Sequence, residues 1–369
     1  VVPALPNLAN RLASDVGTIQ LIVSIYLLAM AAGQLLMGSL SDRFGRRPVL
    51  IVALSVTAGA SVSAVLISTV ESLIAARILQ AVGASAGVVI SRAIIRDLFD
   101  RNRAASMLGL VATVMAVVPT LGPLIGGLLE TGFGWEAIFL FTAITSTLVV
   151  TWAAITLPET RGLNVQHGAR EGFFRDLARL SRSARFAGFV LAGAFGSATF
   201  FAFLGGGAHV VVTLMGRSPA EYGAWFALSS IGYITGNFIS SRLSMRYGIH
   251  RMIWAGIIIE VLGVALSTAL TAFALNWGPL IVFVPQMIVN VGNGLLLPGA
   301  IAGAVSVRPQ SAGTAAGITG FTQMALGAAI AQYAGTLMAD SPSALPLSIL
   351  MDALAIVLVI GFAALVRRA

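Results

Sequence analysis

The stretch GSLSDRFGRRP, residues 38–48, decides the fold class, because it crowds charges into a chain that is otherwise apolar. The chain has 369 residues, is 57% hydrophobic and only 10% charged, and has a mean hydropathy of +0.94. Asp42, Arg43, Arg46 and Arg47 fall within six positions, with long apolar runs on both sides. A water-soluble protein would spread such charges over its surface, so the pattern indicates a membrane protein.

Apolar segments long enough to span a bilayer recur along the whole chain. A spanning helix needs roughly 20 mostly apolar residues, and about eleven segments reach that length, so we expect an all-α membrane protein. The opening VVPALPNL, residues 1–8, is typical of the end of one more helix, which gives twelve spans. The eleven spans are expected at 19–39, 48–69, 72–92, 104–129, 137–157, 186–213, 221–241, 252–274, 277–305, 312–338 and 344–366.

The basic residues orient the chain in the membrane. All 22 are arginines, and 19 of them lie in or beside one alternating set of loops, against Arg11 and Arg217 in the other set and Arg77 inside a span. The positive-inside rule places the arginine-rich loops, and both termini of the full-length protein, in the cytoplasm. The formal charge of +8 therefore reflects topology and not a nucleic-acid partner. The absence of cysteine excludes disulfides and thiol chemistry.

The longest polar segment, 158–185, divides the chain into two six-helix halves, 1–157 and 186–369, of which the first begins with a helix stub. Apolar side chains in this segment repeat at helical spacing against a basic face, which predicts a short amphipathic helix at the membrane surface. A plain tether between the halves is the alternative, and both readings are compatible. The apolar side chains are Phe173, Phe174, Leu177 and Leu180.

The second half repeats the opening stretch. SRLSMRYGIHR, residues 241–251, also follows the second span of its half, in a loop of the same polarity. Parallel repeats related by an axis along the membrane normal are the plan of major facilitator transporters. The matching residues are Leu40, Ser41, Arg43, Phe44 and Gly45 in the first copy and Leu243, Ser244, Arg246, Tyr247 and Gly248 in the second.

The whole chain resembles the major facilitator superfamily, most closely its drug:proton antiporters of the Bcr/CflA type. The family's loop between helices two and three resembles GSLSDRFGRRP, and the end of its first helix resembles VPALPNLA. Its fourth helix resembles RILQAVGASAG and SRAIIRDLF, its fifth-helix antiporter motif VVPTLGPLIGG, and the end of its sixth helix LPET. Second-half signatures resemble SPAEYGAWFAL, GNGLLLP and AGTAAGITGFTQM. The resemblance implies proton-driven efflux of small amphipathic drugs by alternating access, with no cofactor.

The charged loop is where we expect a conformational latch. Gly38 and Gly45 suit tight helix ends, and Pro48 suits the first turn of the next helix. Asp42 lies in a basic loop and needs a partner, which an arginine or the positive end of a helix would supply. Such a pair can join the two halves in one conformation and release them in another; a topology signal with a local ion pair is the alternative. The expected latch residues are Gly38, Asp42, Arg43, Gly45, Arg46 and Arg47.

Arg77 lies inside a span, where a charge costs about 2.5–3.5 kcal/mol on insertion scales. We therefore expect it to face a cavity or a partner, with Gln80 on the same helix face; an arginine that reaches the outer interface past Glu71 is the alternative. The resemblance implies that Arg77 couples proton to substrate by tuning a nearby carboxylate. The expected coupling residues are Arg77, Gln80, Arg92, Arg96 and Asp97.

The antiporter motif supplies small residues. Gly122, Gly126 and Gly127 are placed where two helices can approach closely, with Pro123 kinking the span. Helix packing without a transport role is the alternative. The resemblance implies that this bend seals the outer side and distinguishes antiporters from symporters and uniporters.

A proton-coupled exporter needs a titratable group in or beside its cavity. The intramembrane acids are Glu260 and Asp352, in the ninth and twelfth spans. Both spans are peripheral in the family's arrangement, so we expect these acids to be interfacial or helix-packing residues. In the resembling antiporters an acid commonly lies a few residues before the PALP segment, at a position that here falls before Val1.

Aromatic, methionine and amide side chains near the middle of several spans suit an adaptable pocket for amphipathic molecules. Gln286, Asn290 and Asn293 form a polar stripe at i, i+4 and i+7, which would be costly to expose to lipid. For the other candidates plain helix packing is the alternative. The candidates are Tyr26, Met30, Met107, Met115, Phe200, Phe203, Tyr233, Asn237, Gln286, Asn290, Asn293 and Gln323.

Catalysis has no support in the sequence. His167, His209 and His250 lack metal-ligand spacing, and the glycines of 205–207 lie in a span, where they predict a bend or unwinding and not a phosphate loop. The expected partners are a small-molecule substrate, protons and the lipid bilayer, and we expect a monomer. A transporter of metabolites with the same fold is the first alternative. A non-transporting receptor, to which Arg77 would be dispensable, is a more remote one.

Overall fold

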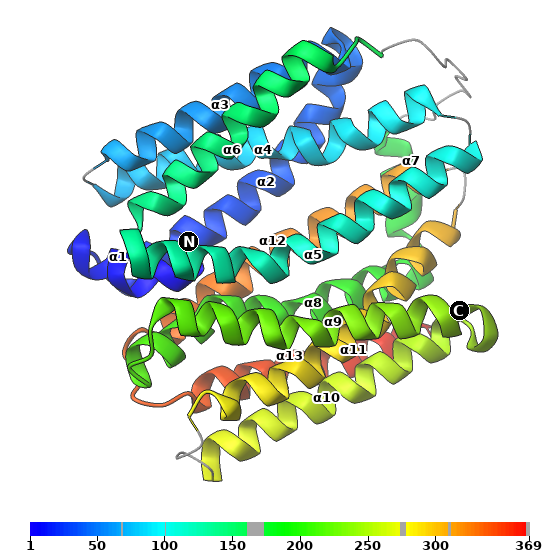
Figure 1. Ribbon diagram of the computed structural model, residues 1–369. Coiled ribbons are helices and arrows are strands. Elements are labelled where there is room, and N and C mark those ends of the chain that lie inside the picture. Colours follow the sequence, from blue (N-terminus) through cyan, green and yellow to red (C-terminus); the bar gives the residue numbers. More distant parts are fainter. Residues whose placement is uncertain (68, 100, 161–172, 274–277, 309–310, 367–369) are drawn as a thin grey trace.

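The computed structural model describes residues 1–67, 69–99, 101–160, 173–273, 278–308 and 311–366 (Figure 1). In these described ranges, eleven helices of 21 residues or more match the eleven expected spans. Within the described residues, eight of them are long and apolar enough to cross a membrane. The eleven are α2 (Val16–Phe44), α3 (Arg46–Leu66), α4 (Val70–Leu98), α5 (Arg101–Phe133), α6 (Glu136–Thr156), α8 (Ala184–Ala208), α9 (Pro219–Tyr247), α10 (Ile249–Phe273), α11 (Leu280–Ser306), α12 (Ala312–Ala339) and α13 (Leu345–Val366).

Shorter helices lie before the first long helix and between the two halves. The first residues form η1 (Val2–Ala4) and α1 (Leu5–Arg11), which agrees with a helix end at this position. The central segment contains α7 (Phe173–Ser181), so the predicted short helix is present. Its Leu180 is fully buried in a cluster with Phe186 and Phe189 of α8. The side chains of Phe173 and Phe174 lie outside the described residues, and a position at the membrane surface stays a prediction.

The internal repeat is confirmed at the ends of α2 and α9, which each have 29 residues. α2 ends at Gly45 (φ 102°) and α9 at Gly248 (φ 81°), and glycine adopts positive φ without strain. Just before each glycine an arginine guanidinium lies over the neighbouring aromatic ring. These pairs are Arg43 with Phe44, 5.2 Å to the ring centroid, and Arg246 with Tyr247, 5.5 Å.

The two copies differ in charge. The position of Asp42 in the first copy is taken by Met245 in the second, and the position of Arg46 by Ile249. Met245 is 97% exposed. The shared backbone turn is therefore kept in both halves, while Asp42 and Arg46 have no charged counterpart in the second half.

The long helices form two bundles, α2–α6 and α8–α13, which approach each other at the end where α1 lies (Figure 1). Two helix pairs join the bundles, α2 with α12 and α5 with α9. By the internal repeat, α2 is equivalent to α9 and α5 to α12, so the two contacts are equivalent as well. Both contacts lie at the arginine-poor ends of the helices, because they involve the start of α2 and α9 and the end of α5 and α12.

Aromatic rings fill the core of the second bundle. Phe203 of α8 stacks on Phe226 of α9, with 6.1 Å between centroids, and meets Phe283 of α11 edge-on at 5.6 Å. After the three glycines at 205–207 the winding of α8 widens into the π-helical turn η2 (His209–Leu214), which agrees with the predicted change of winding. A Cβ on Gly205 would lie 2.9 Å from the carbonyl carbon of Ala331, so this glycine also brings α8 against α12.

Candidate functional site

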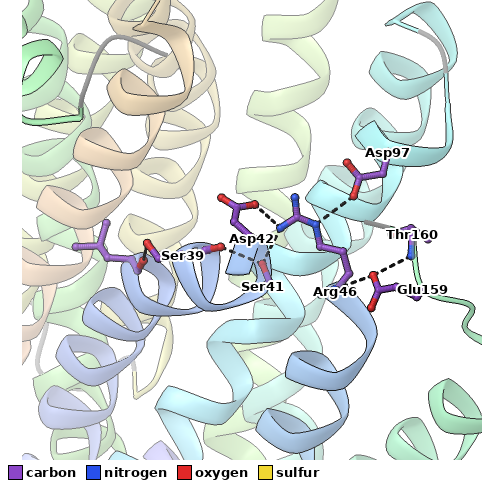
Figure 2. Close-up of polar contacts among 9 residues, drawn as sticks. Ser39, Ser41, Asp42, Arg46, Asp97, Glu159 and Thr160 are labelled. Atoms are coloured by element: carbon purple, nitrogen blue, oxygen red, sulfur yellow. Dashed lines mark hydrogen bonds and ion pairs between the residues drawn. The ribbon is translucent and has the colours of Figure 1, made fainter. Parts of the chain in front are cut away.

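Arg46 is the centre of an ionic cluster at the arginine-rich end of the first bundle (Figure 2). Its Nη1 lies 2.5 Å from Oδ1 of Asp42 and donates to Oγ of Ser41 at 2.8 Å, and its Nε donates to Oδ2 of Asp97 at 3.1 Å. The Arg46 side chain is only 13% exposed. Its planar fork thus ties the end of α2 and the start of α3 to the end of α4.

Glu159, in the LPET segment after α6, completes this cluster. Its two carboxylate oxygens accept the backbone N–H groups of Arg46 and Arg47 at 2.9 and 3.2 Å. These are the first N–H groups of α3, which have no partner within the helix, and the positive end of the helix favours a carboxylate there. A Cβ on Gly45 would lie 2.5 Å from Glu159 Oε2, so the glycine is needed for this approach as well as for its positive φ. The sequence reading missed Glu159, although LPET marked the position.

The expected partner of Asp42 is therefore an arginine, Arg46, of the same bundle. The ionic contacts join α2, α3, α4 and the segment after α6, all in the first half. Asp97, expected as a coupling residue, belongs to this cluster. The expected helix end at Gly38 was wrong: α2 continues to Phe44, so Gly38 lies inside the helix, with a Cβ position 3.6 Å from Val89, and its part in a latch stays a prediction. Arg92 is exposed near the end of α4, and the side chain of Arg96 lies outside the described residues.

Arg77 lies in the second turn of α4 and is fixed by three groups. Its guanidinium carbon sits 3.9 Å from the ring centroid of Tyr26, its Nε donates to the Ile22 carbonyl at 3.2 Å, and its Nη1 donates to Gln80 Oε1 at 2.6 Å. Gln80 in turn donates to Ser61 Oγ of α3 at 2.6 Å. Arg77 and Gln80 thus share a helix face, as expected, and are connected to α2 and α3.

These residues line a cavity of about 430 Å³, whose wall also includes Val1 and Val2 at the start of the chain. Tyr26, Arg77 and Gln80 form part of its wall, so three of the predicted residues meet at one place. The wall also contains apolar side chains of the first bundle and Leu204 of α8, from the second half. The sequence reading missed its hydroxyl groups, which are Thr57 of α3 and Thr142 and Ser146 of α6.

The antiporter motif brings α5 and α9 into backbone contact. A Cβ on Gly127 would lie 2.9 Å from the carbonyl carbon of Pro219 in α9, and a Cβ on Gly223 would lie 2.8 Å from Cα of Leu124 in α5. Cβ atoms essentially never come this close to backbone, so each helix contributes one glycine to the contact. Thr131 Oγ1 accepts the Ala220 N–H at 3.1 Å and so caps the start of α9 from the other half.

The other members of the motif differ. A Cβ on Gly126 would meet Val1 and Pro3 at 3.6 and 3.9 Å, an ordinary contact distance. A Cβ on Gly122 would meet no described residue within 4 Å, so the expected close approach at Gly122 was wrong. α5 remains helical through Pro123.

The amide stripe of α11 is buried inside the second bundle. Gln286, Asn290 and Asn293 are 2%, 4% and 2% exposed, which agrees with the expectation that they avoid lipid. Gln286 donates to Asn290 Oδ1 at 3.2 Å, and Asn290 donates to the Ser229 carbonyl of α9 at 3.0 Å. These residues pack between helices and are not among those that line the 430 Å³ cavity.

The remaining substrate candidates whose side chains are described are also not among the residues that line this cavity. Phe203 lies in the aromatic core of the second bundle. Asn237 donates to the Tyr233 carbonyl of its own helix at 2.9 Å, and Gln323 packs on Gly193 of α8. The side chain of Met115 lies outside the described residues. The other members of this set are Met30, Met107 and Phe200, which are partly exposed.

The acids inside the bundles pack against neighbouring helices. Glu260 is fully buried and accepts from Thr199 Oγ1 of α8 at 2.7 Å, and Asp352 accepts from Thr268 Oγ1 of α10 at 2.5 Å. Both agree with the helix-packing expectation. A third acid was missed: α5 extends past the expected end of its span to Phe133, and its Glu130, 8% exposed, accepts from Asn7 at 2.8 Å. Within the described residues, no cluster of three or more His, Asp or Glu side chains is placed to hold a metal ion.

Comparison with known proteins agrees with this architecture. A family model described as Major Facilitator Superfamily matches residues 1–332. The chain is 28% identical over 378 residues to an uncharacterized MFS-type transporter, YdgK, of Bacillus subtilis, covering 99% of this chain and 90% of that protein. It is 32% identical over 311 residues to a chloramphenicol resistance protein of Pseudomonas aeruginosa, covering 84% and 71%. It is 30% identical over 326 residues to multidrug resistance protein D of Escherichia coli, covering 87% and 80%.

Solved structures share the fold at low sequence identity. A bacterial homologue of the human lysosomal transporter Spinster, in an inward-facing and occupied conformation, superposes with a TM-score of 0.76 at 16% identity, over 100% of this chain and 92% of that one. The xylose transporter XylE of Escherichia coli superposes with a TM-score of 0.73 at 13% identity, over 99% and 92%.

Proposed function

The chain belongs to the major facilitator superfamily, and we propose that it is a proton-coupled antiporter that exports small amphipathic drugs across the bacterial cytoplasmic membrane. It is a multi-pass membrane protein with the all-α fold of that superfamily, whose transporters act on small molecules. We propose further that it acts as a monomer, without a cofactor or a catalytic step. Its units would be a six-helix half at 1–157, a linker at 158–185 and a second half at 186–369.

The observation that carries the proposal is the contact of α5 with α9 through Gly127 and Gly223. This contact lies at the arginine-poor end, which the positive-inside rule assigns to the outside. We call the α5–α9 and α2–α12 contacts together the outer seal. With the seal closed, the two bundles meet on the outer side, and the arginine-rich ends face the cytoplasm. A fold that seals one side by helix contact between two halves is suited to alternating access.

The cavity supplies the site for substrate and coupling. Its wall combines apolar side chains with hydroxyl, amide and aromatic groups, which suits an amphipathic molecule. Arg77 places a fixed positive charge there, held by Gln80, Tyr26 and the Ile22 carbonyl. A fixed cation in a poorly solvated wall favours the ionised form of a nearby carboxyl group, so it can link proton release to substrate binding. In this mechanism protons enter from outside, displace the drug outward and leave to the cytoplasm.

The ionic cluster around Arg46 would act on the cytoplasmic side. Asp42 and Asp97 are held by Arg46 in the present conformation, and Arg43 lies beside them on the end of α2. A rearrangement of these pairs when the cytoplasmic side closes would make the cluster a latch. The names of two relatives, a chloramphenicol resistance protein and multidrug resistance protein D, support export of drugs.

The test uses the full-length protein in everted membrane vesicles that respiration acidifies inside. Chloramphenicol-like and cationic drugs are added in turn, and a partial collapse of the internal acidity is expected for a transported drug. Arg77→Ala should abolish the response. Arg217→Ala, which removes an exposed arginine at the opposite end from the cluster, is the matched control and should retain it. Absence of a response to every drug, with the protein verified in the membrane, would favour a metabolite transporter of the same fold.

A further inference from the structure

The α2–α12 half of the outer seal is polar, and one glutamine bridges it. Gln332 of α12 accepts from Ser24 Oγ of α2 at 2.5 Å and donates through Nε2 to the Gly17 carbonyl at 2.8 Å. Both partners belong to the other half of the protein. Both ends of the Gln332 amide therefore make hydrogen bonds that exist only while the seal is closed.

A second glutamine at the same contact has the opposite effect. Gln20 of α2 is 2% exposed, and its Nε2 is buried with no hydrogen-bond partner in the part of the chain that the structure describes. It packs on Gly335 of α12, where a Cβ would lie 2.7 Å from Gln20 Cδ. A buried amide without a hydrogen-bond partner destabilises the closed state. When the contact opens, water can supply the missing hydrogen bond. Gln20 therefore weakens the closed seal.

We propose that Gln332 and Gln20 are gating residues that set the balance between closed and open outer seal, Gln332 by holding it and Gln20 by loosening it. The polar seam comprises Gly17, Gln20, Ser24, Gln332 and Gly335. An apolar seam would expose hydrophobic surface at every opening, whereas these polar groups exchange protein partners for water at small net cost. The proposal rests on the alternating-access part of the proposed function and not on the identity of the substrate.

The chain offers a direct readout of the seam, because it contains no cysteine. A Cβ on Gly17 would lie 3.1 Å from Cγ2 of Thr336, so cysteines at these two positions are close enough for a disulfide while the seal is closed; it would also lie 3.0 Å from Oδ1 of Asp15, whose side chain must shift by a few tenths of an ångström. Thr336 is exposed and donates to the Tyr333 carbonyl of its own helix, and Gly17 contributes its carbonyl to the seam. The double variant Gly17→Cys/Thr336→Cys therefore leaves the hydrogen bonds of the seam in place.

The test measures the rate of oxidative cross-linking in this background, without substrate or proton gradient. Gln332→Ala removes both bridging hydrogen bonds, so it should lower the closed-to-open ratio about five- to tenfold, the effect of two average hydrogen bonds within a membrane, and slow cross-linking by up to that factor. Gln20→Met keeps the length of the side chain and removes the unpaired amide, so it should speed cross-linking and slow turnover of the transporter. Gln323→Ala makes the same amide-to-alanine change in α12, but against Gly193 of the second half, and should leave the rate unchanged.

Opposite shifts of the two variants support the proposal, because a general loss of stability would move both in one direction. Equal rates in all variants, or shifts in the same direction, would overturn it. If Gln332→Ala does not fold, Gln332→Asn, which is one methylene too short to reach both partners, replaces it. Drug-dependent proton movement is measured separately, so a failure there refutes the proposed function and leaves this result interpretable.

Discussion

Substituting alanine for Gly127 is the most direct perturbation of the outer seal. The added Cβ would overlap the carbonyl oxygen of Pro219 and lie 2.9 Å from its carbonyl carbon and 3.1 Å from Cα of Ala220. These atoms belong to the backbone of α9 and cannot move aside as a flexible side chain can. Since ordinary contacts begin near 3.4 Å, α5 and α9 must separate by at least 0.5 Å, the difference between 3.4 and 2.9 Å.

The energetic cost follows from this overlap. Forcing a methyl group into a packed contact costs about 1–3 kcal/mol, and each 1.4 kcal/mol is a factor of ten in an equilibrium. The closed state should therefore lose roughly one order of magnitude in population relative to the open state. Gly122→Ala is the matched control, because it changes a glycine of the same motif to alanine at a site with no described residue within 4 Å. Both variants gain the same helix propensity, about 1 kcal/mol.

The assay is the cross-linking of Gly17→Cys with Thr336→Cys, which reports closure at the other half of the seal. Gly127→Ala should lower the closed-to-open ratio about tenfold, which slows the reaction by up to that factor and lowers drug export, and Gly122→Ala should change neither. If the two substitutions had the same effect, a contact-based account of the motif would be refuted, and the glycines would matter for the helix alone.

Three other positions give predictions of different kinds. Arg46→Lys keeps a positive charge, but lysine cannot reproduce the guanidinium fork that reaches Asp42, Ser41 and Asp97. Drug export measured in vesicles should therefore fall, although the protein stays in the membrane. Glu159→Ala should lower the free energy of unfolding in detergent by about 1 kcal/mol, because the start of α3 loses its cap, and normal stability would count against that role. Arg77→Lys should lose drug-dependent proton movement as Arg77→Ala does, because lysine cannot lie over Tyr26 and also reach both the Ile22 carbonyl and Gln80; full activity would show that the charge alone suffices.

The spans could be predicted because lipid demands about 20 apolar residues from each of them, and composition reports that length directly. The residues at which the spans end could not be predicted in this way. The second span was expected to end at residue 39, but α2 continues to Phe44, since nothing in SLSDRF stops a helix before the positive φ of Gly45. The same shortfall hid Glu130, which lies one residue beyond the expected end of its span and inside α5.

The site was predicted where a residue is unusual for its surroundings. Arg77 stands out because it is a charge inside a span, and the structure places it with Gln80 and Tyr26 on one cavity. Thr142 does not stand out, since hydroxyl side chains in helices commonly bond to their own backbone, as Thr142 does to the Ile138 carbonyl at 2.9 Å.

Contacts between residues from distant parts of the chain could not be predicted either. Gly127 was identified, but the residues it touches in α9 lie about ninety positions away, and no local pattern connects them. The amide stripe of α11 was identified as well. Its burial depends on which helices pack beside α11, and a single sequence does not show which helices these are.

The exposed Met245, standing where the first half has Asp42, makes the two sides of the arginine-rich mouth respond differently to salt. Charges that are partly open to water, such as Asp42 with 44% of its side chain exposed, feel the ionic strength around them. The thioether of Met245 carries no charge and is not affected by ionic strength. Salt should therefore screen the carboxylate of Asp42 in the first half, whereas the equivalent position of the second half has no charge to screen; placing an acid at Met245 would add one to the end of α9, which contains the exposed Arg242 and Arg246.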